Sequence, residues 1–218
     1  MMHLIKSANP ILQWIWALLL LSALVSLGLA RWSLSFVSLV TLVLSLVPPV
    51  LANRWSLTLP MPFLLATTMF LFGSIILGEA FDFYERVWWW DLALHGSAAI
   101  GFGLTGFLFV FMLFEGDRLA APPSAIAFIA FCVAMTMGAL WEVFEFAMDQ
   151  IFALNMQKSG LVDTMGDLII NAVGGAIASL TGYYYQRYDQ AGLLGHGISQ
   201  FIQMNKRLYR KYKMRLKK

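Results

Sequence analysis

Residues 124–149 read SAIAFIAFCVAMTMGALWEVFEFAMD, and they decide what class of protein this is. The run is apolar for most of its length, as a helix in lipid should be, yet its last third carries three carboxylates. Acidic residues inside a membrane span are costly, so they usually face the bundle interior and mark a pathway or a site. Spacings of four, three and four residues place the three carboxylates and one glycine on one face of an α-helix: Gly138, Glu142, Glu145 and Asp149.

The composition of the whole chain agrees with this interpretation. The 218 residues are 60% hydrophobic and only 12% charged, which is too little charge to cover the surface of a soluble domain. We therefore expect an all-α bundle of six transmembrane helices, because the chain holds several apolar stretches of about 18 residues or more. The expected spans are 11–30, 34–51, 61–78, 91–114, 124–151 and 163–185.

Residues 11–30 begin like a signal peptide, but their apolar stretch is long for one, and this favours a retained first span. The lone Cys132 lies inside an apolar run, so it cannot form an internal disulfide and is expected to pack.

Charge is distributed unevenly along the chain. Residues 1–185 hold six Lys/Arg against eleven Asp/Glu, whereas residues 186–218 hold nine against one. We accordingly divide the chain into a transmembrane domain, 1–185, and a basic tail, 186–218. The positive-inside rule places both termini in the cytoplasm, so segments 79–91 and 149–163 face outward.

The tail itself shows helical spacing of apolar residues with basic residues between them. This pattern predicts an amphipathic cytoplasmic helix that lies on anionic inner-leaflet lipids and is dispensable for folding of the bundle. Topology and lipid anchoring explain the positive charge, so no nucleic-acid partner is expected. The apolar positions of the pattern are Ile198, Phe201, Ile202, Leu208, Tyr209, Tyr212 and Leu216.

Two other spans repeat the design of the 138–149 stretch. The fourth span opens with Asp91 and His95, one helical turn apart, and the sixth carries Asp163, Asp167 and Asn171 at successive i+4 positions. Stripes of Gly and Ala continue below both sets, which favours close helix packing. We therefore expect the fourth, fifth and sixth spans to face one another.

Three chemical interpretations of the clustered acids remain open. Like charges packed at low dielectric cannot all stay ionised, so they need a cation or protons. A divalent metal is one solution: carboxylates suit Mg²⁺, Mn²⁺ or Ca²⁺, and His95 allows Zn²⁺. Protonation would instead make the cluster a proton relay, and a hydrogen-bonded network that fixes helix register is the third interpretation. Asp91 and Asp163 could also serve as helix N-caps.

The order of these motifs resembles a known family. Asp91-x-x-x-His95, Gly138-x-x-x-Glu142-x-x-Glu145 and Asp163-x-x-x-Asp167-x-x-x-Asn171 are similar to the motifs of VanZ-like membrane proteins. The local sequence, for example Trp89-Trp90-Asp91, resembles that of the YjdF-type branch of uncharacterised bacterial inner-membrane proteins. The resemblance covers residues 77–182 and implies a multi-pass protein of the bacterial inner membrane. It departs at Leu92 and Glu145, where VanZ proteins often have Lys and Gln. The family is linked to glycopeptide resistance, but no reaction follows from membership.

The leading hypothesis is a metal-dependent membrane enzyme that acts on a lipid or lipid-linked envelope substrate at the outer leaflet. The alternatives are a proton- or cation-coupled transporter that uses the same carboxylates, and a non-catalytic membrane scaffold. The candidate catalytic residues are His95, Glu142 and Asp91; Glu79, Arg86 and Asn171 are candidates for substrate binding; and Glu142, Glu145, Asp149, Asp163 and Asp167 are candidates for metal binding.

Overall fold

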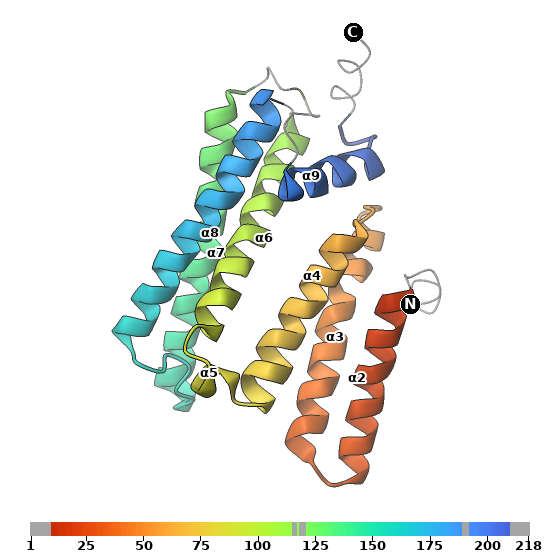
Figure 1. The fold of residues 1–218 in the computed structure, drawn as a ribbon, viewed down its shortest axis with the longest axis vertical. Helices are drawn as coiled ribbons and strands as arrows, with labels where there is room; N and C mark the ends of the chain where they lie inside the picture. Colours follow the sequence, from red (N-terminus) through yellow and green to blue (C-terminus); the bar gives the residue numbers. More distant parts are fainter. Residues whose placement is uncertain (1–9, 115–116, 118–120, 189–191, 210–218) are drawn as a thin grey trace. The chain divides into compact units, whose positions relative to one another are not determined.

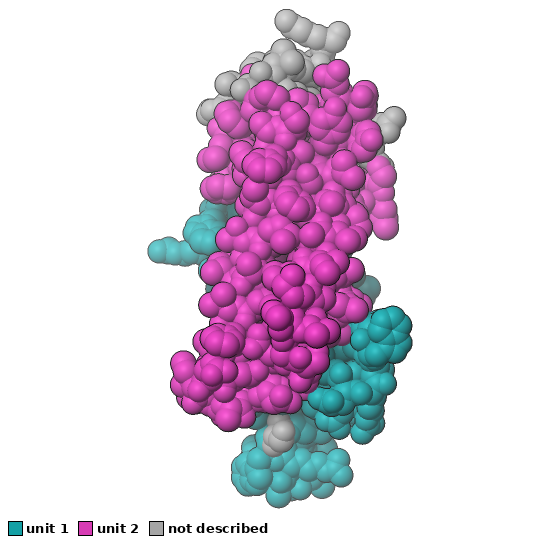
Figure 2. Space-filling model, turned by 90° about the vertical axis from the view of Figure 1, so that its left-hand side faces the viewer, with its two compact units in different colours: residues 1–90 teal, residues 91–218 magenta. Residues whose placement is uncertain are grey.

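The computed structural model describes residues 10–114, 117, 121–188 and 192–209, and every regular element among them is helical. Six helices are long and apolar enough to cross a membrane, which confirms the predicted all-α class and the number of spans. The chain divides into two compact units, Met1–Trp90 and Asp91–Lys218, which Figure 2 colours separately. The six spans are Pro10–Gly28, Leu34–Arg54, Met61–Ala80, Trp90–Leu113, Pro123–Phe152 and Leu161–Tyr188.

The first unit begins with a helical hairpin of α2 (Pro10–Gly28) and α3 (Trp32–Arg54), visible in Figure 1. Hydroxyl side chains join the two helices: Ser22 Oγ and Ser38 Oγ lie 3.0 Å apart, and Ser35 Oγ donates to the carbonyl of Ala23 at 2.9 Å. Small polar residues let two helices approach closely and bond across their interface. The hairpin is therefore held by packing and by hydroxyl hydrogen bonds.

The third span changes its helical geometry part of the way along. It runs as α4 (Met61–Leu71) and continues as a π-helical segment, η1 (Phe72–Ala80), before the short helix α5 (Phe83–Arg86). Trp90 Nε1 donates to the carbonyl of Gly73 at 3.2 Å, and the hydroxyls of Ser74 and Tyr84 lie 2.9 Å apart. These bonds fix the connection after η1. Trp88, on this connection, is 84% exposed, as expected of an aromatic at a lipid–water boundary.

The second unit is built on three long helices, α6 (Trp90–Leu113), α7 (Pro123–Phe152) and α8 (Leu161–Tyr188), followed by α9 (Leu193–Met204). The long helices approach closely at small residues. A Cβ atom added to Gly174 of α8 would lie 2.5 Å from the carbonyl oxygen of Gly96 in α6, and one added to Gly103 would lie 2.6 Å from Ala178 Cβ. The predicted facing of the fourth, fifth and sixth spans is confirmed.

An apolar core closes the end of this bundle opposite the polar residues, and the start of the tail belongs to it. Tyr209 is 1% exposed, and its hydroxyl donates to the carbonyl of Leu108 at 2.9 Å. Burial raises the pKa of the Tyr209 phenol above its usual range. The core residues are Phe107, Val110, Phe111, Ile126, Ala130, Tyr185, Ile198, Ile202 and Tyr209.

This packing differs from the lipid-bound tail expected from the sequence. The apolar side of α9 is buried against protein because the aromatic residues at the end of α6 and α8 offer it a matching surface. Helix α8 also continues to Tyr188, through the boundary that the sequence suggested after Tyr185. The basic residues from Arg210 onward, with Tyr212 and Leu216, lie outside the described residues.

Candidate functional site

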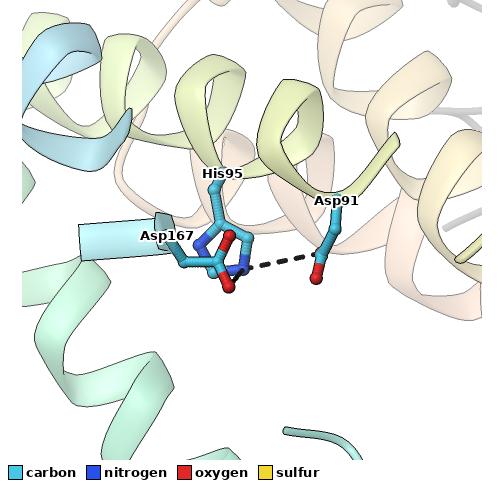
Figure 3. Close-up of side chains that lie close together, drawn as sticks. All are labelled: Asp91, His95 and Asp167. Atoms are coloured by element: carbon cyan, nitrogen blue, oxygen red, sulfur yellow. Dashed lines mark ion pairs between the residues drawn. The ribbon is translucent and has the colours of Figure 1, made fainter. Parts of the chain in front are cut away.

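His95 stands at the centre of a polar cluster formed by α6 and α8 (Figure 3). Its Nε2 lies 3.7 Å from Asp91 Oδ1, one turn earlier on α6, and 4.0 Å from Asp167 Oδ2 on α8. One ligand-type atom from each of these three residues lies within 4.8 Å of the others. In the part of the chain that the structure describes, this is the group of His, Cys, Asp and Glu side chains suited to one metal ion.

The opposite edge of the imidazole faces α7 and a second position on α8. Nδ1 lies 3.7 Å from Glu142 Oε1 and 3.4 Å from Asn171 Nδ2. Gly138, one turn before Glu142, leaves room for the Asn171 amide, since a Cβ atom at this position would lie 2.8 Å from Asn171 Cγ. The three helices thus bring His95, Glu142 and Asp167 together, as their spacing in the sequence predicts.

Several carboxylate oxygens of the cluster are buried without a hydrogen bond. Glu142 is 5% exposed and Asp167 is 2% exposed, and no donor within hydrogen-bonding geometry serves either oxygen of Glu142, Oδ2 of Asp167 or Oδ2 of Asp163. The Thr164 hydroxyl approaches Glu142 without completing that geometry. A buried carboxylate with no partner is costly, so a bound cation or a proton would stabilise this arrangement.

Glu145 and Asp163 extend the negative charge of the cluster. Glu145 is buried, and its Oε1 accepts a hydrogen bond from Trp141 Nε1 at 2.8 Å. Asp163 interacts electrostatically with Asp91 and His95 at the start of α8. Lys158, exposed on the loop between α7 and α8, lies within electrostatic range of both Asp91 and Asp163. The loop therefore brings a positive charge to the side of the cluster on which Asp91 is 27% exposed.

Asp149 is engaged by the same loop. Its Oδ1 accepts the backbone N–H of Met156 at 2.5 Å, and its Oδ2 accepts that of Gln157 at 2.9 Å. The Gln157 side chain then donates to Thr164 Oγ1 at 2.7 Å. The structure gives Asp149 a role in holding the loop, while the other predicted metal-binding carboxylates lie at the cluster.

Two of the predicted substrate-binding residues belong to the first unit. Glu79 is the next-to-last residue of the π-helical segment, and the exposed Arg86 pairs with the exposed Asp82 at 3.4 Å. Their place at the mouth of the site stays a prediction. The third, Asn171, is 1% exposed and contacts His95, so it acts inside the cluster.

Three residues that support the cluster were not among the predicted site residues. Trp141 lies four residues before Glu145, and this i,i+4 spacing was a signal that could have identified the hydrogen bond. Gln157 and Thr164 meet across the α7–α8 loop, and no local pattern in the sequence predicts that contact.

Comparison with known proteins identifies the family. The profile of a family described as "Predicted membrane protein (DUF2238)" matches residues 12–188, so this chain belongs to that family of membrane proteins. A Thermotoga maritima protein described as an "Uncharacterized protein" is 32% identical over 111 residues, which are 51% of this chain and 55% of the relative. The chain thus spans about half the length of this relative. No solved structure matches the chain.

Proposed function

We propose that this protein is a membrane enzyme that uses a divalent metal ion held by Asp91, His95 and Asp167. The observation that carries the proposal is that their three ligand atoms lie within 4.8 Å of one another. Each donor lies about 2.0–2.6 Å from a bound ion, so two donors of one ion are at most about 5 Å apart. The unpartnered oxygen of the buried Asp167 supports the same proposal, since an ion would satisfy it.

The set of donor atoms suits a catalytic metal ion. Two carboxylates and one imidazole leave coordination positions open, as catalytic metal sites do, and they fit Zn²⁺, Mn²⁺ or Mg²⁺. A divalent ion bound there would act as a Lewis acid toward an ester or phosphoryl oxygen. The protein's own contribution is to hold the three donors on two packed helices and to leave Asp91 partly exposed. Glu145 and Asp163 add negative charge that attracts the ion.

The substrate that best fits this setting is a lipid or a lipid-linked envelope molecule at the outer leaflet. The cluster lies near the ends of three apolar spans, where a headgroup can reach it while the acyl chains stay in the bilayer. Lys158 supplies positive charge beside the cluster, which favours an anionic group such as a phosphate. The resemblance to VanZ-like and YjdF-type proteins supports a bacterial inner-membrane location, and the excess of basic residues in the tail supports cytoplasmic termini.

Metal binding can be tested on the purified protein in lipid nanodiscs. After treatment with a chelator, Mg²⁺, Mn²⁺, Ca²⁺ and Zn²⁺ are added back in turn while the metal content and Tm are measured. We expect one bound ion and a rise in Tm, because an ion at 100 times its Kd stabilises the folded state by about 2.7 kcal/mol. Asp167→Asn should abolish both effects. Asp82→Asn is the matched control, since Asp82 is an exposed carboxylate of the first unit.

The enzymatic part of the proposal needs its own measurement. Nanodiscs that contain bacterial envelope lipids are incubated with the metal-loaded protein, and the release of headgroups is followed by mass spectrometry. Turnover should require the ion and should be lost in Asp167→Asn but kept in Asp82→Asn. A protein that binds metal yet leaves every envelope lipid intact would refute the enzyme and leave a metal-binding membrane protein.

The buried carboxylates support a second candidate function, a proton- or cation-coupled transporter. Both oxygens of Glu142 are without a hydrogen bond, and protonation would remove their charge as an ion would. A Tm that is indifferent to chelator and to all four ions would decide for this candidate. Proton uptake into proteoliposomes, absent in Glu142→Gln, would then be the measurement to make.

A further inference from the structure

The two ring nitrogens of His95 face different chemical surroundings. Nε2 points toward Asp91 Oδ1 and Asp167 Oδ2, at 3.7 and 4.0 Å, and these three atoms form the group suited to an ion. Nδ1 points the other way, toward Glu142 Oε1 at 3.7 Å. The imidazole therefore separates Glu142 from the two aspartates.

This position sets Glu142 apart from the residues that can reach the ion. Its side chain is 5% exposed, and neither of its oxygens has a partner in full hydrogen-bond geometry, the nearby Thr164 hydroxyl included, so a further donor would stabilise this buried carboxylate. The nearest ring nitrogen, Nδ1, carries a hydrogen whenever Nε2 is the atom that binds a metal. A carboxylate that accepts this hydrogen fixes the tautomer and the orientation of the ring.

We propose that Glu142 is a positioning residue: it accepts the Nδ1–H of His95 and so presents Nε2 to a divalent ion held with Asp91 and Asp167. This inference rests on the proposed metal site and gives Glu142 a role different from that of a ligand. Glu142 acts on the ion through His95.

Asn171 also faces Nδ1 of His95, and its amide is compatible with this assignment. Its Nδ2 lies 3.4 Å from the same Nδ1, so in this arrangement the amide can donate to an unprotonated Nδ1, with the ring hydrogen on Nε2. A half-turn of the amide would present its oxygen to Nδ1–H instead. Both neighbours of Nδ1 can then accept its hydrogen once an ion occupies Nε2. Ion binding is therefore expected to switch the tautomer of His95.

The first experiment measures metal affinity in nanodiscs with Mn²⁺ and Zn²⁺ as probes. Loss of a carboxylate that supports a metal-binding His typically weakens binding about 10–100-fold. Glu142→Gln should therefore bind one ion with a Kd raised by about this factor, whereas Asp167→Asn should bind none. Glu85→Gln is the matched control, because Glu85 is an exposed carboxylate of the first unit and its loss should leave the Kd within about twofold of wild type.

Each outcome of this titration has a distinct meaning. Complete loss of the ion in Glu142→Gln would make Glu142 a direct ligand and overturn the proposal. A Kd equal to that of wild type would overturn it as well. If wild-type protein binds neither probe, the metal site itself fails, and this is distinguishable because Asp167→Asn then changes nothing.

A spectroscopic readout separates positioning from a general loss of stability. The chain has three histidines, so His3→Gln with His196→Gln leaves His95 as the single imidazole for ¹⁵N NMR. In this background, Zn²⁺ should give a spectrum with a protonated Nδ1 and a metal-bound Nε2. In Glu142→Gln at saturating Zn²⁺ the Nδ1 resonance should move, while Nε2 stays metal-bound. An Nδ1 resonance unchanged by the substitution would contradict the proposed hydrogen bond.

Discussion

Gly138 of α7 lies so close to Asn171 of α8 that no side chain fits between them: an added Cβ atom would lie 2.8 Å from Asn171 Cγ. The contact explains why a glycine stands one turn before Glu142 in a helix. Its absence of a side chain lets the Asn171 amide reach Nδ1 of His95. Close packing of two helices and the geometry of the cluster therefore depend on the same pair of residues.

Gly138→Ala consequently separates helix propensity from the integrity of the site. Alanine is the better helix former by about 1 kcal/mol, so helix α7 alone would gain stability. We expect the opposite for the protein: displacement of Asn171 should lower both Tm and metal affinity. Gly101→Ala in α6 is the control, because a Cβ atom at Gly101 meets no atom within 4 Å, and it should be neutral or stabilising. Equal behaviour of the two variants would contradict the packing argument.

Asp149 provides a second prediction, on the loop between α7 and α8. Both of its oxygens accept backbone N–H groups of this loop, and hydrogen bonds to charged groups contribute roughly 1.5–3 kcal/mol each. Asp149→Ala should therefore increase hydrogen exchange across residues 153–160 while the number of bound ions stays the same. Loss of the ion in this variant would show that Asp149 is a metal ligand, as predicted from the sequence. Asp82→Asn, which removes an exposed ion pair, should leave exchange in the loop unchanged.

Trp141 and Glu145 form a pair suited to a double-mutant cycle. Trp141→Phe removes the N–H that donates a hydrogen bond to the buried Glu145 carboxylate, and such an unpaired group costs about 1–3 kcal/mol or more when charged. Glu145→Gln removes the charge instead and should be nearly neutral. Combining the two substitutions should then cost less than the sum of the single effects, since no buried charge remains to be satisfied. Chemical unfolding in detergent gives the coupling energy, and strict additivity would show that the two side chains do not interact.

The tail gives a prediction that reverses an expectation from the sequence. Because Ile198, Ile202 and Tyr209 are buried in the bundle core, truncation after Tyr188 should destabilise the second unit rather than leave it intact. Tyr209→Ala should cost about 3–5 kcal/mol, as other large aromatic-to-alanine changes do, whereas Tyr209→Phe loses only the bond to Leu108 and should cost about 1 kcal/mol. Tyr188→Phe is the control, since Tyr188 is 55% exposed. An unchanged Tm in the truncated protein would instead support a tail that lies on the membrane surface and does not stabilise the bundle.

The sequence could predict the class of fold and the meeting of three helices, because both follow from local patterns. Apolar length sets the number of spans, and i+4 spacing sets the face on which Asp91, His95 and Asp167 lie. Three such polar faces can be buried together only if the helices turn them toward one another. No membrane-facing alternative is compatible with the cost of a lipid-exposed carboxylate.

The different roles of the individual carboxylates could not be predicted from the sequence. Glu142 and Asp149 share one face of α7, yet one lies beside His95 and the other binds the loop. The loop's path decides this difference, and it depends on left-handed backbone at Ala153 and Asn155, which no periodic pattern signals. The sequence pattern could not predict that α9 is buried against protein either, because an apolar helix face can pack on lipid or on an aromatic protein surface equally well.

The last prediction concerns the side of the membrane on which the site opens. From six spans and a basic tail, the positive-inside rule predicts that the loop with Lys158 lies outside the cell and the turn near Arg54 inside. In a Cys132→Ser background, Ser159→Cys should therefore react with a membrane-impermeant maleimide in intact cells. Asn53→Cys should react only after the cells are permeabilised. The reverse pattern would turn the site toward the cytoplasm, and the substrate would then have to be a lipid of the inner leaflet. Reaction of both cysteines in intact cells would mean that the number of crossings between them is even, which contradicts the six-span topology itself.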